Sequence, residues 1–205
     1  MIRKTSEVLI VVLAVSFLAA ASAAPTTGIS EDIRRRAAAG DVVVTDELPP
    51  GASKTARGGT AVAVLRASPD QVWRVIMDYR SHPRFYPHMT SADVVERGDR
   101  RALIRYRVAV GRFSFRFYME NYPDPRQRRV EWRLAAGRPH GLFRENSGYW
   151  QVNATDNGAA SLVTYAIAVR VMLPASVTAR GERASLTETI VALRKLVETP
   201  HSRAD

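Results

Sequence analysis

The sequence contains no cysteine, which excludes disulfide bonds and thiolate chemistry, so the fold must rely on its apolar core. Histidine is also scarce, with four in 205 residues. His82 and His88 lie six residues apart across two prolines, whereas His140 and His201 are predicted in a loop and in the tail. None has the short spacing that zinc sites favour. We therefore predict surface or loop histidines, no metal site and no cofactor.

Motifs of several enzyme classes are missing as well. There is no phosphate loop and no dinucleotide fingerprint, since Gly58-Gly59 alone indicates only a turn. A serine nucleophile on a glycine-flanked turn is also missing, and Ser147-Gly148 is the nearest approach to one. Glu120 and Glu131 alternate with arginines on neighbouring predicted strands, which favours cross-strand ion pairs on a wet surface over an acid–base pair. We assign no catalytic residue.

Long hydrophobic runs are absent except at the N-terminus. Arg3 and Lys4 precede an apolar stretch from Val8 to Leu18, and Ala21-Ser22-Ala23 supplies small residues for cleavage. This layout is typical of a secretory signal peptide, so we predict that residues 1–23 are removed after Ala23 and that the protein is periplasmic or secreted. The alternative is an uncleaved signal that anchors the protein in the inner membrane, for which this run is short.

Acidic residues are in the minority, with 20 Asp and Glu against 30 Lys and Arg and a formal net charge of +10. Such a chain would attract anionic surfaces, so an anionic membrane surface is a candidate partner. The arginines are spread over nearly every predicted strand, however, which favours a solvated basic surface. Export argues against a nucleic-acid partner.

A long helix is predicted from Ser185 to Thr199, with Pro200 just past its end. Because Gly181 lies shortly before it, the sequence does not determine the first residue of this helix. Its apolar residues recur at spacings of four, three and four and therefore share one face of the helix: Leu186, Ile190, Leu193 and Val197. Something must cover that face. A curved antiparallel sheet wrapped around the helix is the simplest cover, because the preceding segments are mostly strands with one apolar face.

These preceding segments can be read in order. Residues 24–59 are predicted as a leader that contains a short helix, capped by Ser30 and ended by Gly40, and an edge strand over Val42–Thr45. A first main strand over Thr60–Arg66 leads into two short helices. Six consecutive strands follow, over residues 92–96, 101–110, 113–120, 129–134, 143–153 and 163–171. Turns are expected between them, notably at 123–127 and at the Asp-Asn-Gly hairpin signal of 156–158.

This order of elements resembles the START-like superfamily, also called SRPBCC or helix-grip, and in particular its polyketide cyclase and coenzyme Q-binding branch. Three local sequences are similar to that branch: Ser68-Pro69-Asp70-Gln71-Val72-Trp73 after a strand, Asp78-Tyr79 followed by Phe85-Tyr86-Pro87, and Gly148-Tyr149-Trp150. The resemblance covers about residues 41–199. It implies an α+β helix-grip fold over residues 60–199, with two short helices between the first two main strands and a tail over 200–205.

Aromatic residues on the apolar phase of the strands form the candidate binding site: Tyr106, Phe115, Phe117, Trp132, Trp150 and Tyr165. An ordinary filled core gives the same pattern. The resemblance implies instead a cavity for an apolar ligand between sheet and helix, lined by these six residues and by Leu186, Ile190 and Leu193. A tyrosine hydroxyl inside it would need a partner from ligand, water or backbone.

We therefore predict an exported module that binds a lipid, an isoprenoid or another hydrophobic small molecule in this cavity. Two alternatives stay open. The resemblance also implies a polyketide cyclase or aromatase, in which inward tyrosines or arginines direct proton transfer, although the arginines here alternate outward. The other alternative is a basic adaptor that docks on a membrane or a protein and holds no ligand. The sequence predicts no oligomeric state.

Overall fold

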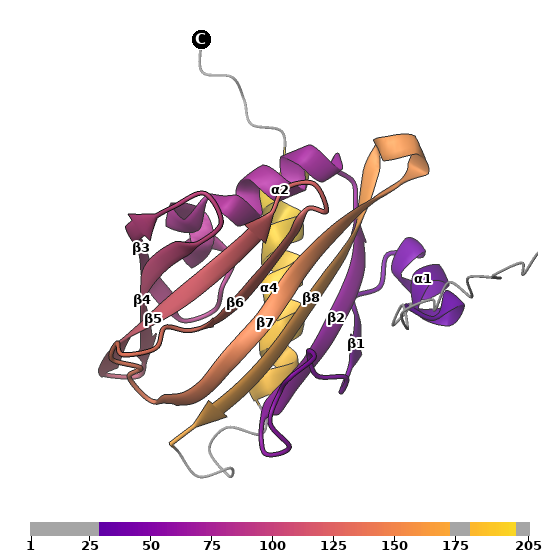
Figure 1. Cartoon of the computed structure of the whole chain (residues 1–205). Coiled ribbons are helices and arrows are strands. Elements are labelled where there is room, and N and C mark those ends of the chain that lie inside the picture. Colours follow the sequence, from indigo (N-terminus) through magenta and orange to yellow (C-terminus); the bar gives the residue numbers. More distant parts are fainter. Residues whose placement is uncertain (1–28, 173–180, 200–205) are drawn as a thin grey trace, which may run out of the picture.

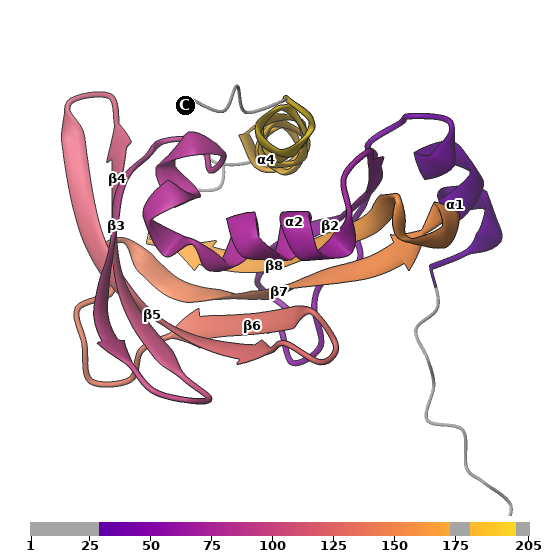
Figure 2. The ribbon, with the colours of Figure 1, turned by 90° about the horizontal axis from the view of Figure 1, so that it is seen from above.

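The computed structural model describes residues 29–172 and 181–199 (Figure 1). The predicted signal peptide and the tail lie outside the described residues. One antiparallel sheet of 8 strands carries the fold, in the order β1-β2-β8-β7-β6-β5-β4-β3. It curves strongly, and α2 and α4 lie on its concave side (Figure 2). Every neighbouring pair of strands except β2 and β8 is consecutive in the sequence.

The elements follow the predicted order. The strands are β1 (Val43–Thr45), β2 (Arg57–Leu65), β3 (Met89–Arg97), β4 (Ala102–Val110), β5 (Phe113–Asp124), β6 (Arg129–Leu134), β7 (Phe143–Thr155) and β8 (Ala160–Val171). The helices are α1 (Glu31–Ala38), α2 (Pro69–Met77), the 3-10 helix η1 (Tyr79–Arg84), the short 3-10 turn η2 (Asp156–Gly158) and α4 (Gly181–Glu198). The α+β helix-grip architecture is confirmed.

Side-chain caps start the first two helices where the sequence predicts them. The Ser68 hydroxyl accepts a hydrogen bond from the Gln71 amide at 3.3 Å, and Pro69 occupies the first turn of α2. The Ser30 hydroxyl accepts from the Ile33 amide at 3.4 Å at the start of α1. Each cap satisfies an amide that the helix itself leaves unpaired.

Several element boundaries differ from the predictions; β2, for example, begins at Arg57 rather than Thr60, and β8 begins at Ala160 rather than Val163. The turn expected from Pro123 begins later, because β5 continues through Pro123 to Asp124 and pairs with β6. β4 pairs with β5 only as far as Asn121, so at Pro123 the strand has a neighbour on one side alone, where a missing N–H is tolerated. The C-terminal helix begins at Gly181, before the predicted start at Ser185.

Helix α4 packs closely over β2, and this contact forms much of the core. Its stripe residues are buried as predicted: Leu186, Ile190, Leu193 and Val197. The residues of β2 that share the buried face are small at Gly59, Ala61 and Ala63, so the helix can approach the strand closely. Burying each large stripe side chain stabilises the fold by roughly 1.5–3 kcal/mol.

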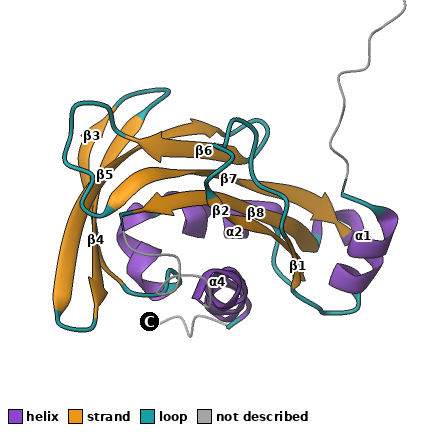
Figure 3. Ribbon diagram, turned by 90° about the horizontal axis from the view of Figure 1, so that it is seen from below, coloured by secondary structure: helices purple, strands orange, loops and turns teal. Residues whose placement is uncertain are grey.

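Polar contacts also hold α4 to the concave face. The Gln71 side-chain amide of α2 donates to the Val197 carbonyl at 2.7 Å, and the Arg66 amide donates to the Glu198 carboxylate at 2.7 Å. On the other face of β2, α1 packs its Ala37 against Val43 and Val62 in a second, smaller core. Figure 3 shows α1 beside β1 at the end of the sheet, away from α4. The leader segment thus contributes one strand and one helix to the packing of the sheet.

Candidate functional site

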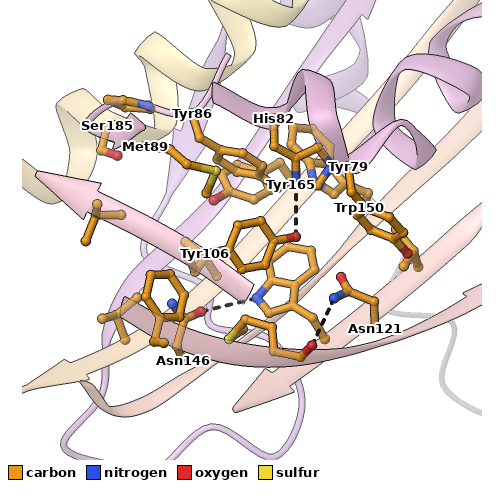
Figure 4. Close-up of a pocket in the computed structure, with 18 of the residues that line it drawn as sticks. Tyr79, His82, Tyr86, Met89, Tyr106, Asn121, Asn146, Trp150, Tyr165 and Ser185 are labelled. Carbon is orange, nitrogen blue, oxygen red and sulfur yellow. Dashed lines mark hydrogen bonds between the residues drawn. The ribbon is translucent and has the colours of Figure 1, made fainter. Parts of the chain in front are cut away.

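A cavity of about 220 Å³ lies between the concave face of the sheet and η1, away from the contact of α4 with β2 (Figure 4). Side chains from β3 to β8 form its floor, and α2, η1 and the turn after η1 contribute its roof. Those at the α2 end, such as Ile76 and Trp150, are fully buried, whereas Val108, Val169 and Ser185 are half-buried. The cavity therefore opens at the end of the sheet where β8 finishes and α4 begins.

The structure brings five of the predicted site residues together around this cavity: Tyr106, Phe117, Trp132, Trp150 and Tyr165. They come from five different strands, β4 to β8, and all face the concave side because they share the inward phase. The Tyr165 ring stacks on the Trp150 indole at 4.2 Å between ring centroids, and on the Trp132 indole at 5.9 Å. This stack fixes the position of the Tyr165 side chain.

Four predicted lining residues lie elsewhere. Leu186, Ile190 and Leu193 are buried where α4 packs on the small residues of β2, and none of them lines this cavity. Phe115 lies beyond the cavity, nearer the tip of the β4–β5 hairpin, with its ring 6.4 Å from that of Phe113. The cavity is thus bounded by η1 and the aromatic strands rather than by the stripe of α4.

Sequence reasoning missed the residues that form the roof, above all Tyr79, His82 and Tyr86. Their spacings of three and four are helical, so they share one face of η1 and the turn after it. Pro83 interrupts this pattern and obscured it. Asn121 and Asn146 were also missed, although both lie on the inward phase of their strands.

His82 is 3% exposed, so the prediction of a surface or loop histidine is wrong for this residue. Its Nε2 lies 2.8 Å from the Ile76 carbonyl oxygen and must therefore carry the proton. Nδ1 then accepts a hydrogen bond from the Tyr106 hydroxyl at 3.1 Å. Burial lowers the pKa of His82 to about 4, against the opposing effects of the Ile76 carbonyl and Asp78. The imidazole is neutral at physiological pH.

Hydrogen bonds hold both indoles of the cavity in place. The Trp150 Nε1–H donates to the Tyr86 hydroxyl at 2.7 Å, and the Trp132 Nε1–H donates to the Asn146 side-chain oxygen at 3.2 Å. The first hydrogen bond joins β7 to the turn after η1, and the second joins the neighbouring strands β6 and β7. The two hydrogen bonds therefore set the orientation of both indoles in the absence of a ligand.

Two tyrosine hydroxyls have no such partner. The Tyr79 hydroxyl is buried without a hydrogen-bond partner, and within the part of the chain that the structure describes the Tyr165 hydroxyl has none either. Burial raises the pKa of Tyr79 to about 12, with Arg97 opposing the rise, and burial also raises the pKa of Tyr86, Tyr106 and Tyr165. These hydroxyls are neutral donors.

The cavity wall carries no ionic group, since none of its described lining residues is Asp, Glu, Lys or Arg. The arginines that alternate with the inward residues of β4, β5 and β6 lie on the outer face, as predicted, whereas the Arg97 guanidinium lies 5.9 Å from the centre of the Tyr79 ring. On the outer face, Glu120 accepts hydrogen bonds from Arg101 at 2.8 Å and from Arg133 at 3.2 Å, which confirms the ion-pair interpretation of that residue. The pKa of Glu120 lies below its usual value. The hydrogen bond from the Tyr122 hydroxyl lowers it most and those from Arg101 and Arg133 lower it less, whereas desolvation opposes the shift.

Across residues 29–172 and 181–199, no group of three or more His, Asp or Glu side chains has the arrangement of a metal site. No helix in these ranges is long and apolar enough to cross a membrane.

Comparisons with known proteins agree with this geometry. Residues 65–193 match the family model described as "Polyketide cyclase / dehydrase and lipid transport". No curated protein matches the sequence. The fold is similar to the Zhui aromatase/cyclase from Streptomyces sp. R1128, at 16% identity and a TM-score of 0.54, covering 68% of this chain and 94% of that one.

Two further solved structures share the fold. A START superfamily protein from Mycobacterium smegmatis has 16% identity and a TM-score of 0.56, with 68% of this chain and 95% of that one covered. A STAR-related lipid transfer protein from Xanthomonas axonopodis has 13% identity and a TM-score of 0.57, with 77% and 99% covered. The chain belongs to the polyketide cyclase/dehydrase and lipid transport family, and its fold is START-like.

Proposed function

We propose that this protein binds a neutral, hydrophobic small molecule in the aromatic cavity. The observation that carries the proposal is a cavity of about 220 Å³ with no ionic group in its described lining and with the Tyr79 hydroxyl buried there without a hydrogen-bond partner. A buried hydroxyl without a hydrogen bond costs about 1–3 kcal/mol. A ligand oxygen placed near the Tyr79 hydroxyl would recover that energy.

The size and electrostatics of the cavity narrow the ligand class. An engineered apolar cavity of about 150 Å³ stays dry and binds benzene, so the larger space here suits a ligand segment of more than one ring or a branched isoprenoid unit. An anionic group would lose its hydration inside this cavity and find no cation in the wall. Fatty-acid carboxylates would therefore bind worse than neutral alcohols, ketones or quinones of similar size.

The environment of His82 and Tyr106 supports holding a ligand over transferring protons. Proton transfer from the tyrosine to the histidine would create two charges in a buried site. Burial raises the pKa of Tyr106 and lowers that of His82, so both shifts oppose this charged state. The resemblance to an aromatase/cyclase and to a lipid transfer protein is at 16% and 13% identity and supports the fold alone.

We also propose that the protein is exported and that residues 1–23 are removed after Ala23, as the N-terminal sequence indicates. N-terminal sequencing of the protein from a periplasmic fraction tests this. A chain that begins at Ala24 is expected. An intact Met1 in the inner-membrane fraction would instead favour the anchored form.

Binding can be tested by tryptophan fluorescence, because two of the three tryptophans line the cavity. Trp73 does not, so Trp73→Phe removes the unrelated signal. We expect saturable changes in the emission of Trp132 and Trp150 with neutral aromatics or quinones, and weaker changes with matched carboxylates. Val130→Phe, which fills the cavity, should abolish the response. A response to no neutral ligand, or one unchanged in Val130→Phe, would contradict the proposal.

A further inference from the structure

We propose that the open end of the cavity docks on an anionic lipid bilayer through the tip of the β4–β5 hairpin. Large apolar side chains are exposed at this end of the sheet: Phe113 is 57% exposed and Met172 is 53% exposed. This goes beyond ligand binding, because it assigns a partner surface and a route by which a membrane-dissolved ligand reaches the cavity.

An apolar track joins Phe113 to the cavity. Phe113, Phe115 and Phe117 alternate along β5 and share its concave face, and Phe117 lines the cavity. On the neighbouring strand, Val108 lies opposite Phe115 and also lines the cavity. The inward face of the sheet therefore continues past the opening and into solvent at the hairpin tip.

Met172 lies at the same end of the sheet. Its amide donates to the Leu142 carbonyl at 2.9 Å, which places it beside the loop between β6 and β7. Gly141, the residue before Leu142 in that loop, lies against β5. A Cβ added at Gly141 would be 3.4 Å from the Phe115 Cβ. The exposed apolar side chains thus belong to one rim around the opening.

Positive charge near the tip of the β4–β5 hairpin has no salt-bridge partner among the described residues. Arg107 and Arg116 lie directly opposite each other on β4 and β5, and Arg112 at the tip lies with its guanidinium 5.3 Å from the centre of the Phe113 ring. Among the described residues, no carboxylate forms a salt bridge with any of these three arginines. Like charges directly opposite on neighbouring strands destabilise a sheet. An anionic surface would remove that repulsion.

The spacing along the hairpin fits a bilayer. The Arg107–Arg116 pair lies three residues behind the Val110–Phe113 pair, which is about 10 Å at the rise of a strand. Side chains of interfacial segments enter the headgroup and acyl boundary by about 5–10 Å. When Phe113 enters that boundary, the two guanidinium groups reach the level of the lipid phosphates.

Vesicle co-sedimentation of the purified protein tests the proposal. We expect binding to vesicles of phosphatidylcholine with phosphatidylglycerol, little binding to pure phosphatidylcholine, and loss of binding at high salt. Phe113→Ser should weaken binding about tenfold. Arg107→Gln with Arg116→Gln should weaken it at least about tenfold, and should leave the melting temperature unchanged or higher because a repulsive pair is removed.

Matched controls lie away from the rim. Val191 on α4 is 49% exposed, and Arg100 lies at the other end of β4, so Val191→Ser and Arg100→Gln should bind as the wild type does. All variants share one N-terminus, so that segment cannot account for differences. Equal binding to both vesicle types, or equal loss in Val191→Ser, would overturn the proposal. A change in oligomeric state with Phe113→Ser, without a change in vesicle binding, would identify the rim as a protein interface instead.

Discussion

The indole of Trp132 lies directly against the α-carbon of Gly148 on the neighbouring strand. The two residues are opposite each other in the register of β6 and β7. A Cβ added at Gly148 would lie 2.5 Å from Trp132 Cζ2 and 2.2 Å from the Ala166 carbonyl oxygen of β8. Only a glycine leaves room for the ring at this position, and the ring in turn covers backbone that would otherwise be exposed to the cavity.

Gly148→Ala should therefore displace the Trp132 ring or the strand. We expect a loss of about 1–3 kcal/mol in the free energy of unfolding, as for other overpacked cores, and an altered Trp132 emission spectrum. Urea titration measures the first effect. Gly98→Ala is the matched control, because an added Cβ there would meet nothing closer than 3.6 Å. Equal stability of the two variants would show that the ring does not depend on the glycine.

Acid should destabilise the protein through His82. Its pKa is about 4 when folded and about 6.5 in an unfolded chain, so the unfolded state binds more protons as the pH falls between these values. The stability that neutral His82 contributes is fully present above pH 6.5 and is lost progressively as the pH falls toward 4. The total loss is about 3 kcal/mol, from 1.36 kcal/mol for each unit of pKa.

Urea titrations at several pH values check this contribution. His82→Gln keeps an N–H for the Ile76 carbonyl but cannot titrate, so its stability should fall much less between pH 6.5 and 4. His88, an exposed residue, supplies the control His88→Gln, which should retain the wild-type dependence. An identical pH dependence in all three proteins would show that His82 is accessible to protons in the folded state.

Removing the hydroxyls of Tyr106 and Tyr165 should have different effects on stability and on ligand affinity. Tyr106→Phe loses the hydrogen bond to His82 and leaves a buried acceptor, which should cost about 1–3 kcal/mol of stability. Tyr165→Phe removes a hydroxyl with no partner among the described residues, so its stability should match or exceed that of the wild type. Its affinity for a ketone or quinone ligand should fall, whereas its affinity for a pure hydrocarbon should not. Calorimetric melting and ligand titration distinguish these results.

Added bulk should have opposite effects on the two sides of the core. Leu193 is 0% exposed and lies outside the cavity, so Leu193→Trp should cost about 1–3 kcal/mol or more and lower the melting temperature by several degrees. Val130→Phe extends into the cavity and should change stability by less than about 1 kcal/mol while abolishing ligand binding. A tolerated Leu193→Trp would mean that space exists under α4 after all.

The periodicity of the sequence predicted which faces are buried, but not the distance between them. The stripe of α4 and the inward aromatics of β4 to β8 were both predicted correctly as apolar faces. Whether two faces touch or enclose a space depends on which strand lies under the helix. That strand is β2, through its pairing with β8, and its small residues Gly59 and Ala61 close the gap. Local patterns carry no information on that pairing.

The roof of the cavity was harder to predict for a different reason. A 3-10 helix interrupted by Pro83 gives a weak periodic signal, so Tyr79, His82 and Tyr86 were not recognised as one face. The pKa of His82 depends on burial, which its own segment does not reveal. The spacing of the histidines therefore predicted a surface or loop residue at His82, where the structure has a buried one.

The pairing of β2 with β8 has a consequence for how the chain folds. Strands β3 to β8 pair with their sequence neighbours through hairpins, which need only short loops to close. Leu65 of β2, by contrast, pairs with Ser161 of β8, and the chain between them includes α2, η1 and the whole meander. Closing so long a loop costs more entropy than closing any hairpin. The meander is therefore expected to form first, and the aromatic cavity, whose roof lies within that loop, to be completed only in the last step.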